Sequence, residues 1–444
     1  MSTAQKIDTF AAVAAERHPS GLYVLFATEM WERFSFYTML AMFTLYLRDT
    51  TGQGFGWTVD QATGLYANYL MFVYASPLVG GWLADKLLGY RKAVMLGGLF
   101  FMAGHLLLSF RSLTIMYLAL ACLVIGNGFF KPNVSAMVGN LYPDGSRLKD
   151  RAYNIFYMGI NCGAFLAPLV AEFVQGRFGF HPAFAVAAGG MAISVWILWR
   201  FKARIEGADR ARGAVSKEKL SDAKRAIDSV PDARRIGALI VVFLIVIVFW
   251  MVFHQNGSTL TYWGNENTAW NVTGIVSNAI NPGWVILLTF PLVGFWKWLD
   301  GKGLEPSTPT KMVFGMIAAS AAFFILFIAA KLGESSVTGE NPYAFKVSPA
   351  WLIGAYAVLT LGELMLSPMG LSLVSKVAPN GLRGLMMGAW FVATAIGNKL
   401  TQIGKLWDDW LHSTFWLLLS GLALGMALIL MLLLRPLKKA MPGV

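Results

Sequence analysis

Five ionisable side chains lie in segments that are otherwise apolar enough to cross a lipid bilayer: Glu29, Glu32, Arg33, Lys131 and Glu363. A charged group at the bilayer centre costs about 2.5–3.5 kcal/mol, so such groups persist mainly where they face a polar interior and have partners. Three acids and two bases sum to one negative charge, which one bound proton would cancel. An amphoteric ligand could then enter without adding net charge. The residue types therefore favour a site that binds protons and a zwitterion.

The densest group of charges lies in the first apolar segment. Glu29, Glu32 and Arg33 are spaced i, i+3 and i+4. Phe36 and Tyr37 follow on the same face of a helix with about 100° per residue. Because one guanidinium cannot neutralise two carboxylates, one of the acids is expected to hold a proton. The alternative is a buried ion network that only holds helices together.

The other two charges lie in separate apolar segments. Lys131 stands in the run Gly126–Asn133, where small residues permit close helix approach and Pro132 frees backbone groups. A lysine there attracts a carboxylate or, alternatively, reaches to the membrane interface. Glu363 stands one turn before Ser367 and needs a cation, either Lys131 or one supplied by a substrate. A permanently protonated, inert Glu363 is the alternative.

The elements that must position these residues are membrane-spanning helices. The chain has 444 residues, of which 56% are apolar and 14% charged, whereas soluble domains carry about 25% charged residues. Strands of an outer-membrane barrel would alternate in ten-residue segments, and the runs here are longer. Twelve apolar runs of spanning length occur, at residues 22–47, 61–84, 93–110, 113–139, 152–175, 182–200, 236–258, 272–298, 312–330, 348–374, 382–404 and 412–434. We predict an all-α integral membrane protein.

A polar stretch divides the twelve runs into two sets of six. The predicted segments are 1–21, a cytoplasmic N-terminus; 22–200, an N-terminal six-helix bundle; 201–235, a cytoplasmic linker; 236–434, a C-terminal six-helix bundle; and 435–444, a cytoplasmic tail. Two bundles of six spans are typical of the major facilitator fold, in which the halves rock about a central site. Between the second and third spans, Asp85 precedes a Gly turn and the bases Arg91 and Lys92. This turn could lock neighbouring helix ends together in one conformation.

The distribution of positive charge predicts the orientation. The net charge is +12, and loops on the side of the two termini hold roughly four times as many Lys and Arg as the opposite loops, which favours cytoplasmic termini. Contact of these loops with anionic lipid headgroups explains the basic balance without a nucleic acid partner. We expect a multi-pass protein of the bacterial inner membrane.

Several segments together resemble the proton-dependent oligopeptide transporter family of the major facilitator superfamily. Residues 29–37 are similar to its ExxERFxYY motif. Other similar segments are GNGFFKPNVSAMVGNLY (126–142), FYMGINCGAFLAP (156–168), NP (281–282), GELMLSPMGLSLVSKVAP (362–379) and MMGAWFVATAIGN (386–398). The resemblance implies symport of di- and tripeptides with protons by alternating access, in a prokaryotic member with twelve spans.

The resemblance also implies roles for individual residues. The peptide carboxylate is assigned to Arg33, Lys131 and Tyr37. The peptide ammonium is assigned to Glu363, Asn161 and Asn281. Tyr74 and Trp390 would line side-chain pockets, Trp390 also near the inner gate, while Glu29 and Glu32 would link proton binding to Arg33.

Three positions depart from the family pattern. Phe36 replaces a tyrosine, and Leu40 stands where the family usually has a second arginine. In the seventh span His254 precedes Gln255, where the family often has an acid. The absence of both Arg and acid would remove a salt bridge at the outer gate. His254 could instead act as a pH-sensitive gate element, or it could be a hydrogen-bonded histidine at a helix end.

Other function classes find less support in the sequence. The five histidines are scattered, and the two cysteines lie in separate apolar runs, so neither a catalytic constellation, a disulfide framework nor a metal site is predicted. We therefore expect no enzyme activity and no cofactor beyond the coupling proton, and a monomer. Within transporters, the alternative is a relative that carries another small anionic or amphoteric solute. A signalling scaffold and a channel are the remaining alternatives.

Overall fold

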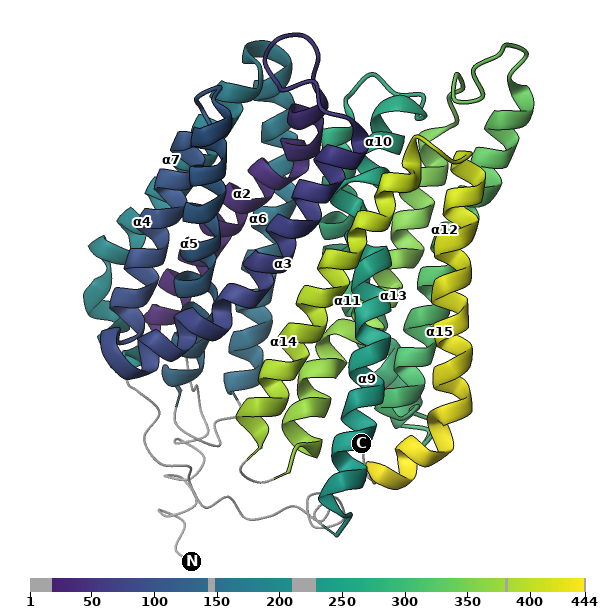
Figure 1. Ribbon diagram of the computed structural model, residues 1–444. Helices are drawn as coiled ribbons and strands as arrows, with labels where there is room; N and C mark the ends of the chain where they lie inside the picture. Colours follow the sequence, from purple (N-terminus) through teal and green to yellow (C-terminus); the bar gives the residue numbers. More distant parts are fainter. Residues whose placement is uncertain (1–17, 143–147, 210–228, 380–381, 443–444) are drawn as a thin grey trace, which may run out of the picture.

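The computed structural model describes residues 18–142, 148–209, 229–379 and 382–442, so the predicted N-terminal segment, linker and tail lie partly outside the described residues. Within them the chain is all-α, as predicted, with twelve helices of 18 residues or more. Figure 1 shows two bundles side by side, the N-terminal one in purple and blue and the C-terminal one in green and yellow.

The helices of the two bundles follow one another in chain order. The N-terminal bundle contains α2 (Ser20–Arg48), α3 (Val59–Leu83), α4 (Tyr90–Leu107), α5 (Leu113–Asn140), α6 (Leu148–Phe178) and α7 (Phe180–Arg200). The C-terminal bundle contains α9 (Asp232–Phe253), α11 (Ser277–Asp300), α12 (Thr308–Ser336), α13 (Pro349–Val377), α14 (Arg383–Leu400) and α15 (His412–Ala440). A 3-10 turn, η3 (His254–Gly257), joins α9 to the short α10 (Thr259–Glu266), so the seventh predicted span is interrupted.

The spans are not equally apolar. By length and composition, eight helical segments of the described chain could cross a membrane, and α2, α3, α4 and α14 are not among them. Helix α2 contains the three charges Glu29, Glu32 and Arg33. A helix that lines a polar interior must replace apolar residues with polar ones, which lowers its mean hydropathy.

Close helix contacts through glycine position the helix that carries Lys131. A Cβ atom at Gly128 of α5 would lie 2.9 Å from the backbone oxygen of Ser76 in α3. One at Gly126 would lie 2.9 Å from the backbone nitrogen of Phe101 in α4. The predicted close approach of small residues around Lys131 is therefore confirmed, since α5 packs against both neighbours without room for a side chain.

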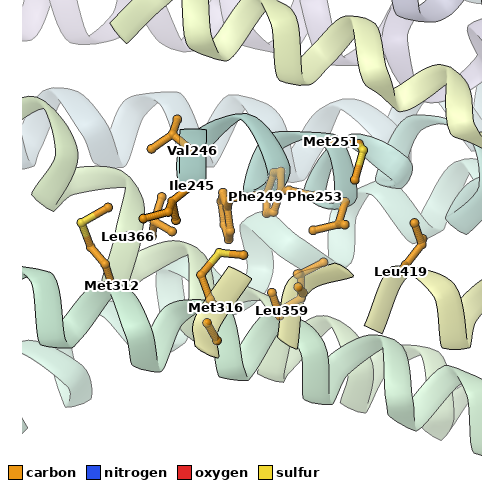
Figure 2. Packing of buried hydrophobic residues seen from close by; sticks show 14 of the residues in the cluster. Ile245, Val246, Phe249, Met251, Phe253, Met312, Met316, Leu359, Leu366 and Leu419 are labelled. Carbon is orange, nitrogen blue, oxygen red and sulfur yellow. The ribbon is translucent and has the colours of Figure 1, made fainter. Parts of the chain in front are cut away.

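The C-terminal bundle is held by an apolar cluster beside a second glycine contact. Figure 2 shows Ile245 and Phe249 of α9 facing Met316 of α12, with Leu359 of α13 nearby. Helices α12 and α13 cross at Gly315 and Gly362, where a Cβ on either glycine would lie within 2.8 Å of the other's carbonyl oxygen. Gly362 directly precedes Glu363, so this crossing fixes the backbone that carries the acid.

The two bundles are joined at one end. We call the end at which α2 begins and α15 ends the terminal side, and the opposite end the far side (Figure 1). Polar contacts between the bundles gather on the far side. They include Thr44 Oγ1 to the Gly257 carbonyl at 2.9 Å, Arg48 to Glu266 at 2.7 Å and Lys405 to Asp60 at 2.9 Å. The structure is thus closed on the far side.

In this state, no ion pair of Asp85 with a neighbouring helix end is present among the described residues. Asp85 is exposed, in the π-helical turn that follows α3. Gly89 has φ +75°, the left-handed conformation that glycine adopts without strain. Arg91 instead contacts Asp209: its backbone N–H donates a hydrogen bond to Oδ1 of Asp209 at 2.9 Å. In this state, which is closed on the far side, the turn after α3 therefore binds Asp209 of the predicted linker.

Candidate functional site

The charged face of α2 is buried and internally paired. Glu29, Glu32 and Arg33 are each at most 2% exposed. The Arg33 guanidinium donates through Nε and Nη2 to both carboxylate oxygens of Glu32. Its Nε lies 3.5 Å from Oε1 of Glu29. The predicted helical face is therefore confirmed, and the two acids share one guanidinium.

The two acids of α2 are not equivalent. Glu32 accepts two hydrogen bonds from Arg33, whereas Oε2 of Glu29 is buried without a hydrogen-bond partner among the described residues. A buried carboxylate oxygen without a partner is costly when the group is ionised. Glu29 is therefore the better placed of the two to hold a proton.

The aromatic residues after Arg33 complete this face. The guanidinium carbon lies 4.8 Å from the ring centroid of Phe36 and 5.9 Å from that of Tyr37. Phe36 is buried, and Tyr37 is partly exposed. Phe36 thus packs beneath the guanidinium as a cation–π partner, a role that needs no hydroxyl group.

Lys131 provides a cation beside this cluster. Its Nζ lies 5.2 Å from the ring centroid of Tyr74 in α3, and its side chain is partly exposed. The charges of Arg33, Glu29 and Glu32 all act on Lys131. Among the described residues no carboxylate lies within 4.0 Å of its ammonium. Lys131 is therefore available to an incoming anion in a way that Arg33 is not.

The acid of the C-terminal bundle is held by an amide. Asn281 of α11 donates through Nδ2 to Oε2 of Glu363 at 2.9 Å and to Oγ1 of Thr360 at 2.9 Å. Thr360 and Glu363 are three residues apart on one face of α13. Glu363 is partly exposed. Asn281 fixes one carboxylate oxygen and leaves the other open to a donor.

Three tyrosines lie near Glu363, and one of them also contacts Lys131 of the other bundle. The carboxylate of Glu363 acts electrostatically on the hydroxyls of Tyr37, Tyr74 and Tyr157. Tyr74 also packs under the ammonium of Lys131. Tyr74 therefore lies between Lys131 of the N-terminal bundle and Glu363 of the C-terminal bundle. Lys131, Glu363, Tyr37 and Tyr74 are partly exposed, and Tyr157 is exposed.

His254 lies where the broken seventh span meets the N-terminal bundle. Its ring is stacked on Trp250, with centroids 5.1 Å apart, and meets Tyr74 edge-on at 5.6 Å. The ring is 6% exposed, and neither nitrogen has a hydrogen-bond partner among the described residues. The hydrogen-bonded alternative is therefore wrong for this state. The His254 carbonyl accepts a 3.5 Å hydrogen bond from Tyr66.

Of the two remaining predicted site residues, Asn161 contacts Tyr157 beside this centre, whereas Trp390 lies apart from it. Asn161 is buried on α6, and its Nδ2 donates to the Tyr157 carbonyl at 2.9 Å. Trp390 is 4% exposed within the apolar cluster of the C-terminal bundle. Its indole fills the space above Gly370, where a Cβ would lie 1.8 Å from the ring. In this state Trp390 packs between helices.

Sequence reasoning missed two members of the site, Tyr157 and Thr360. Tyr157 precedes Asn161 by one helical turn, and Thr360 precedes Glu363 by almost one turn. Helical spacing from the predicted residues was the signal that could have found both. The ion pair between Arg48 and Glu266 was missed as well. No periodicity connects two residues separated by 218 positions.

Comparison with known proteins assigns the chain to a class. Residues 25–400 match the sequence profile of the Major Facilitator Superfamily. A di-/tripeptide transporter of Lactococcus lactis subsp. cremoris is 28% identical, and the match covers 96% of this chain and 97% of the relative. These similarities define a membrane transporter and not an enzyme.

Solved structures give the same fold and narrow the class. A mutant of the peptide transporter POT in complex with alafosfalin has a TM-score of 0.84 at 28% identity, covering 96% of each chain. A POT family transporter in complex with 5-aminolevulinic acid has a TM-score of 0.83 at 26% identity, covering 95% of this chain and 97% of the other. This chain belongs to the proton-dependent oligopeptide transporter family of the major facilitator superfamily.

Proposed function

We propose that this protein is a proton-coupled symporter that imports di- and tripeptides by alternating access. The peptide carboxylate binds at Lys131 and Arg33, with Tyr37 beside it. The ammonium binds at Glu363, with Asn281 and Asn161. One observation carries the proposal: a cation from the N-terminal bundle, Lys131, and an acid from the C-terminal bundle, Glu363, flank the same tyrosine, Tyr74. A zwitterion that contacts both charges draws the bundles together.

Proton coupling follows from competition for the guanidinium of Arg33. The two oxygens of Glu32 occupy two of the five N–H donors of Arg33, those on Nε and Nη2, and Glu29 lies beside Nε. A peptide carboxylate needs these donors. Protonation of Glu29 or Glu32 weakens the contact of that acid with the Arg33 guanidinium. The N–H donors that become free can then bind a peptide carboxylate beside Lys131. Proton and peptide binding then favour one another, which is the linkage that symport requires.

His254 is proposed as a gate element on the far side. Its unpartnered ring is buried between Trp250 and Tyr74, close to the positive charge of Lys131. Besides Tyr74, the titratable side chain of Tyr66 also faces this turn. A proton on the imidazole would place a second, uncompensated cation there. Acid on that side therefore favours a state in which the far side opens and the ring meets water.

The proposal includes orientation and assembly. The termini face the cytoplasm of a bacterial cell whose inner membrane holds the protein, so the closed far side is periplasmic or extracellular. Both halves of the site come from one chain, which supports a monomer as the functional unit. Protons are the coupling ion, and no other cofactor is required.

Uptake of labelled dialanine into proteoliposomes tests this function. An imposed inward-acid pH gradient is expected to drive accumulation, and collapse of the gradient by a protonophore is expected to return it to equilibration. Liposomes without protein give the baseline. Uptake that does not depend on the gradient, and that Glu32→Gln leaves unchanged, would remove proton symport.

A second candidate substrate class is another small amphoteric or anionic solute. Leu40 stands where the family usually has an arginine, and here it is buried in the apolar core of the N-terminal bundle. One cation fewer at the site weakens selection for a peptide carboxylate. The family member solved with 5-aminolevulinic acid supports this class. Competition between 5-aminolevulinic acid and labelled dialanine distinguishes the two substrate classes. A carrier of non-peptide solutes would prefer 5-aminolevulinic acid.

A further inference from the structure

A groove on the lipid-facing surface of the C-terminal bundle lies outside the proposed transport site. It runs between the first turns of α9 and the last turns of α15, which lie side by side in Figure 1. Its cavity volume is about 510 Å³. Gly237 and Val241 of α9 line one wall, and Leu433 and Leu437 of α15 line the other. Both walls of the groove are therefore apolar.

Basic residues stand at the open end of the groove. Arg234 and Lys439 line it, and both are exposed. Lys438 and Arg435 lie on the same final turns of α15. Among the described residues, no carboxylate lies within ion-pair distance of these four cations. Three of them follow the apolar run of α15 and Arg234 precedes the apolar run of α9, so all four lie at the level of lipid headgroups.

We propose that this groove binds an anionic diacyl phospholipid such as phosphatidylglycerol. An acyl chain fits the apolar walls, and the phosphate meets Arg234 and Lys439. Charge complementarity selects the anionic lipid, since a zwitterionic headgroup would bring a second cation to a basic rim. Basic pockets between spanning helices recognise anionic headgroups in this way.

The first test measures lipid binding by the full-length protein in detergent. The unfolding temperature, followed by tryptophan fluorescence, is recorded while dioleoylphosphatidylglycerol or dioleoylphosphatidylcholine is added. We expect saturable stabilisation by phosphatidylglycerol alone. In the variant Arg234→Gln/Lys439→Gln the half-saturating concentration rises about 25-fold, about fivefold for each cation removed.

A matched variant controls for net charge. Lys297→Gln/Lys302→Gln removes two exposed cations at the same side of the membrane, away from the groove. It is expected to bind phosphatidylglycerol as the wild type does. Equal loss in both double variants would show diffuse surface attraction and overturn the proposal. So would equal stabilisation by the two lipids, or by glycerophosphoglycerol, which lacks acyl chains.

A second pair of variants tests the apolar part without changing charge. A Cβ at Gly237 meets nothing within 4 Å, so Gly237→Leu fills the groove without a clash. Gly294→Leu is the control, because Gly294 of α11 has equally open surroundings. We expect weaker phosphatidylglycerol binding only in Gly237→Leu. Unchanged binding in that variant would exclude an acyl chain from the groove. Binding is measured without transport, so either result leaves the proposed symport untouched.

Discussion

The two bundles hold their central charges in different ways. In the N-terminal bundle Glu29, Glu32 and Arg33 are buried on one helix and already satisfy one another to a large extent. In the C-terminal bundle Glu363 is a single, partly exposed acid held by a neutral amide of Asn281. In the N-terminal bundle two acids compete for one guanidinium. In the C-terminal bundle one carboxylate is available to a ligand.

This difference suggests a division of labour. A paired network responds to protonation because removing one acid changes the partners of the others. A lone acid held by an amide has fewer states and acts as an anchor for an ammonium group. Lys131 lies between these cases, since the network acts on it while its ammonium has no carboxylate within 4.0 Å among the described residues. The proposed symport uses all three behaviours.

The largest expected effect is that of Lys131→Ala. Loss of a charge-assisted contact to the peptide carboxylate should lower dialanine uptake at low substrate concentration by about 10- to 100-fold. Lys331→Ala removes an exposed lysine from the far-side end of α12 and should leave uptake unchanged. Wild-type uptake by Lys131→Ala would mean that the carboxylate binds elsewhere and that the N-terminal bundle offers no available cation.

Glu32→Gln should separate coupling from binding. One proton per peptide supplies about 1.4 kcal/mol for each pH unit, or about tenfold accumulation. We expect this accumulation to disappear while exchange of labelled for unlabelled dialanine continues. Glu363→Gln, by contrast, should reduce both. If both variants lost accumulation and exchange alike, the proposed division between network and anchor would be wrong.

The sequence predicts the network better than it predicts the anchor. The i, i+3, i+4 spacing of Glu29, Glu32 and Arg33 determines a shared helical face, because helix geometry is local. The contact between Asn281 and Glu363 depends on the packing of α11 against α13. The family resemblance placed both residues near the ammonium, but residue spacing alone could not show that the amide holds the acid.

Contacts that belong to one conformational state are the least predictable. Trp390 was expected to line a pocket, yet in the state closed on the far side its ring packs over Gly370. The turn at Asp85 could lock helix ends in one conformation, and in this state Asp85 is exposed while Asp209 binds Arg91. A transporter must form different contacts in each state, and a pattern of residues does not say which state is present.

A smaller effect is expected on the anchor side from Asn281→Ala. Without this amide, the Glu363 carboxylate loses a hydrogen bond to a charged group worth about 1.5 kcal/mol, which corresponds to about a tenfold higher KM for dialanine. Thr360→Val removes only the second acceptor of Asn281 and should change KM less. A loss of proton coupling in Asn281→Ala at unchanged KM would instead place proton binding in the C-terminal bundle.

His254→Ala tests whether the far-side turn senses pH. We expect dialanine counterflow by the wild type to rise in acid as protonation favours opening, and we expect the variant to lose about half or more of this rise. His181→Asn is the control, because His181 lies near the far side with hydrogen-bond partners for both ring nitrogens. Identical pH profiles for wild type and His254→Ala would exclude this residue as a gate element.

The smallest effect is expected from the ion pair between Arg48 and Glu266. This pair joins the two bundles on the far side. Its side chains are 22% and 36% exposed, so their coupling should amount to only about 0.2–1 kcal/mol. Arg48→Gln or Glu266→Gln should therefore increase opening of the far side by a few fold at most.

Opening is measured by labelling Thr63→Cys, a fully buried far-side position, with a membrane-impermeant thiol reagent after Cys122 and Cys162 are replaced by serine. The double variant Arg48→Gln/Glu266→Gln should label no faster than either single variant, because both remove the same contact. Additive increases would show that the residues act independently. The stacking of Arg48 on Tyr262, with its guanidinium carbon 4.4 Å from the ring centroid, would then be the contact that closes the gate.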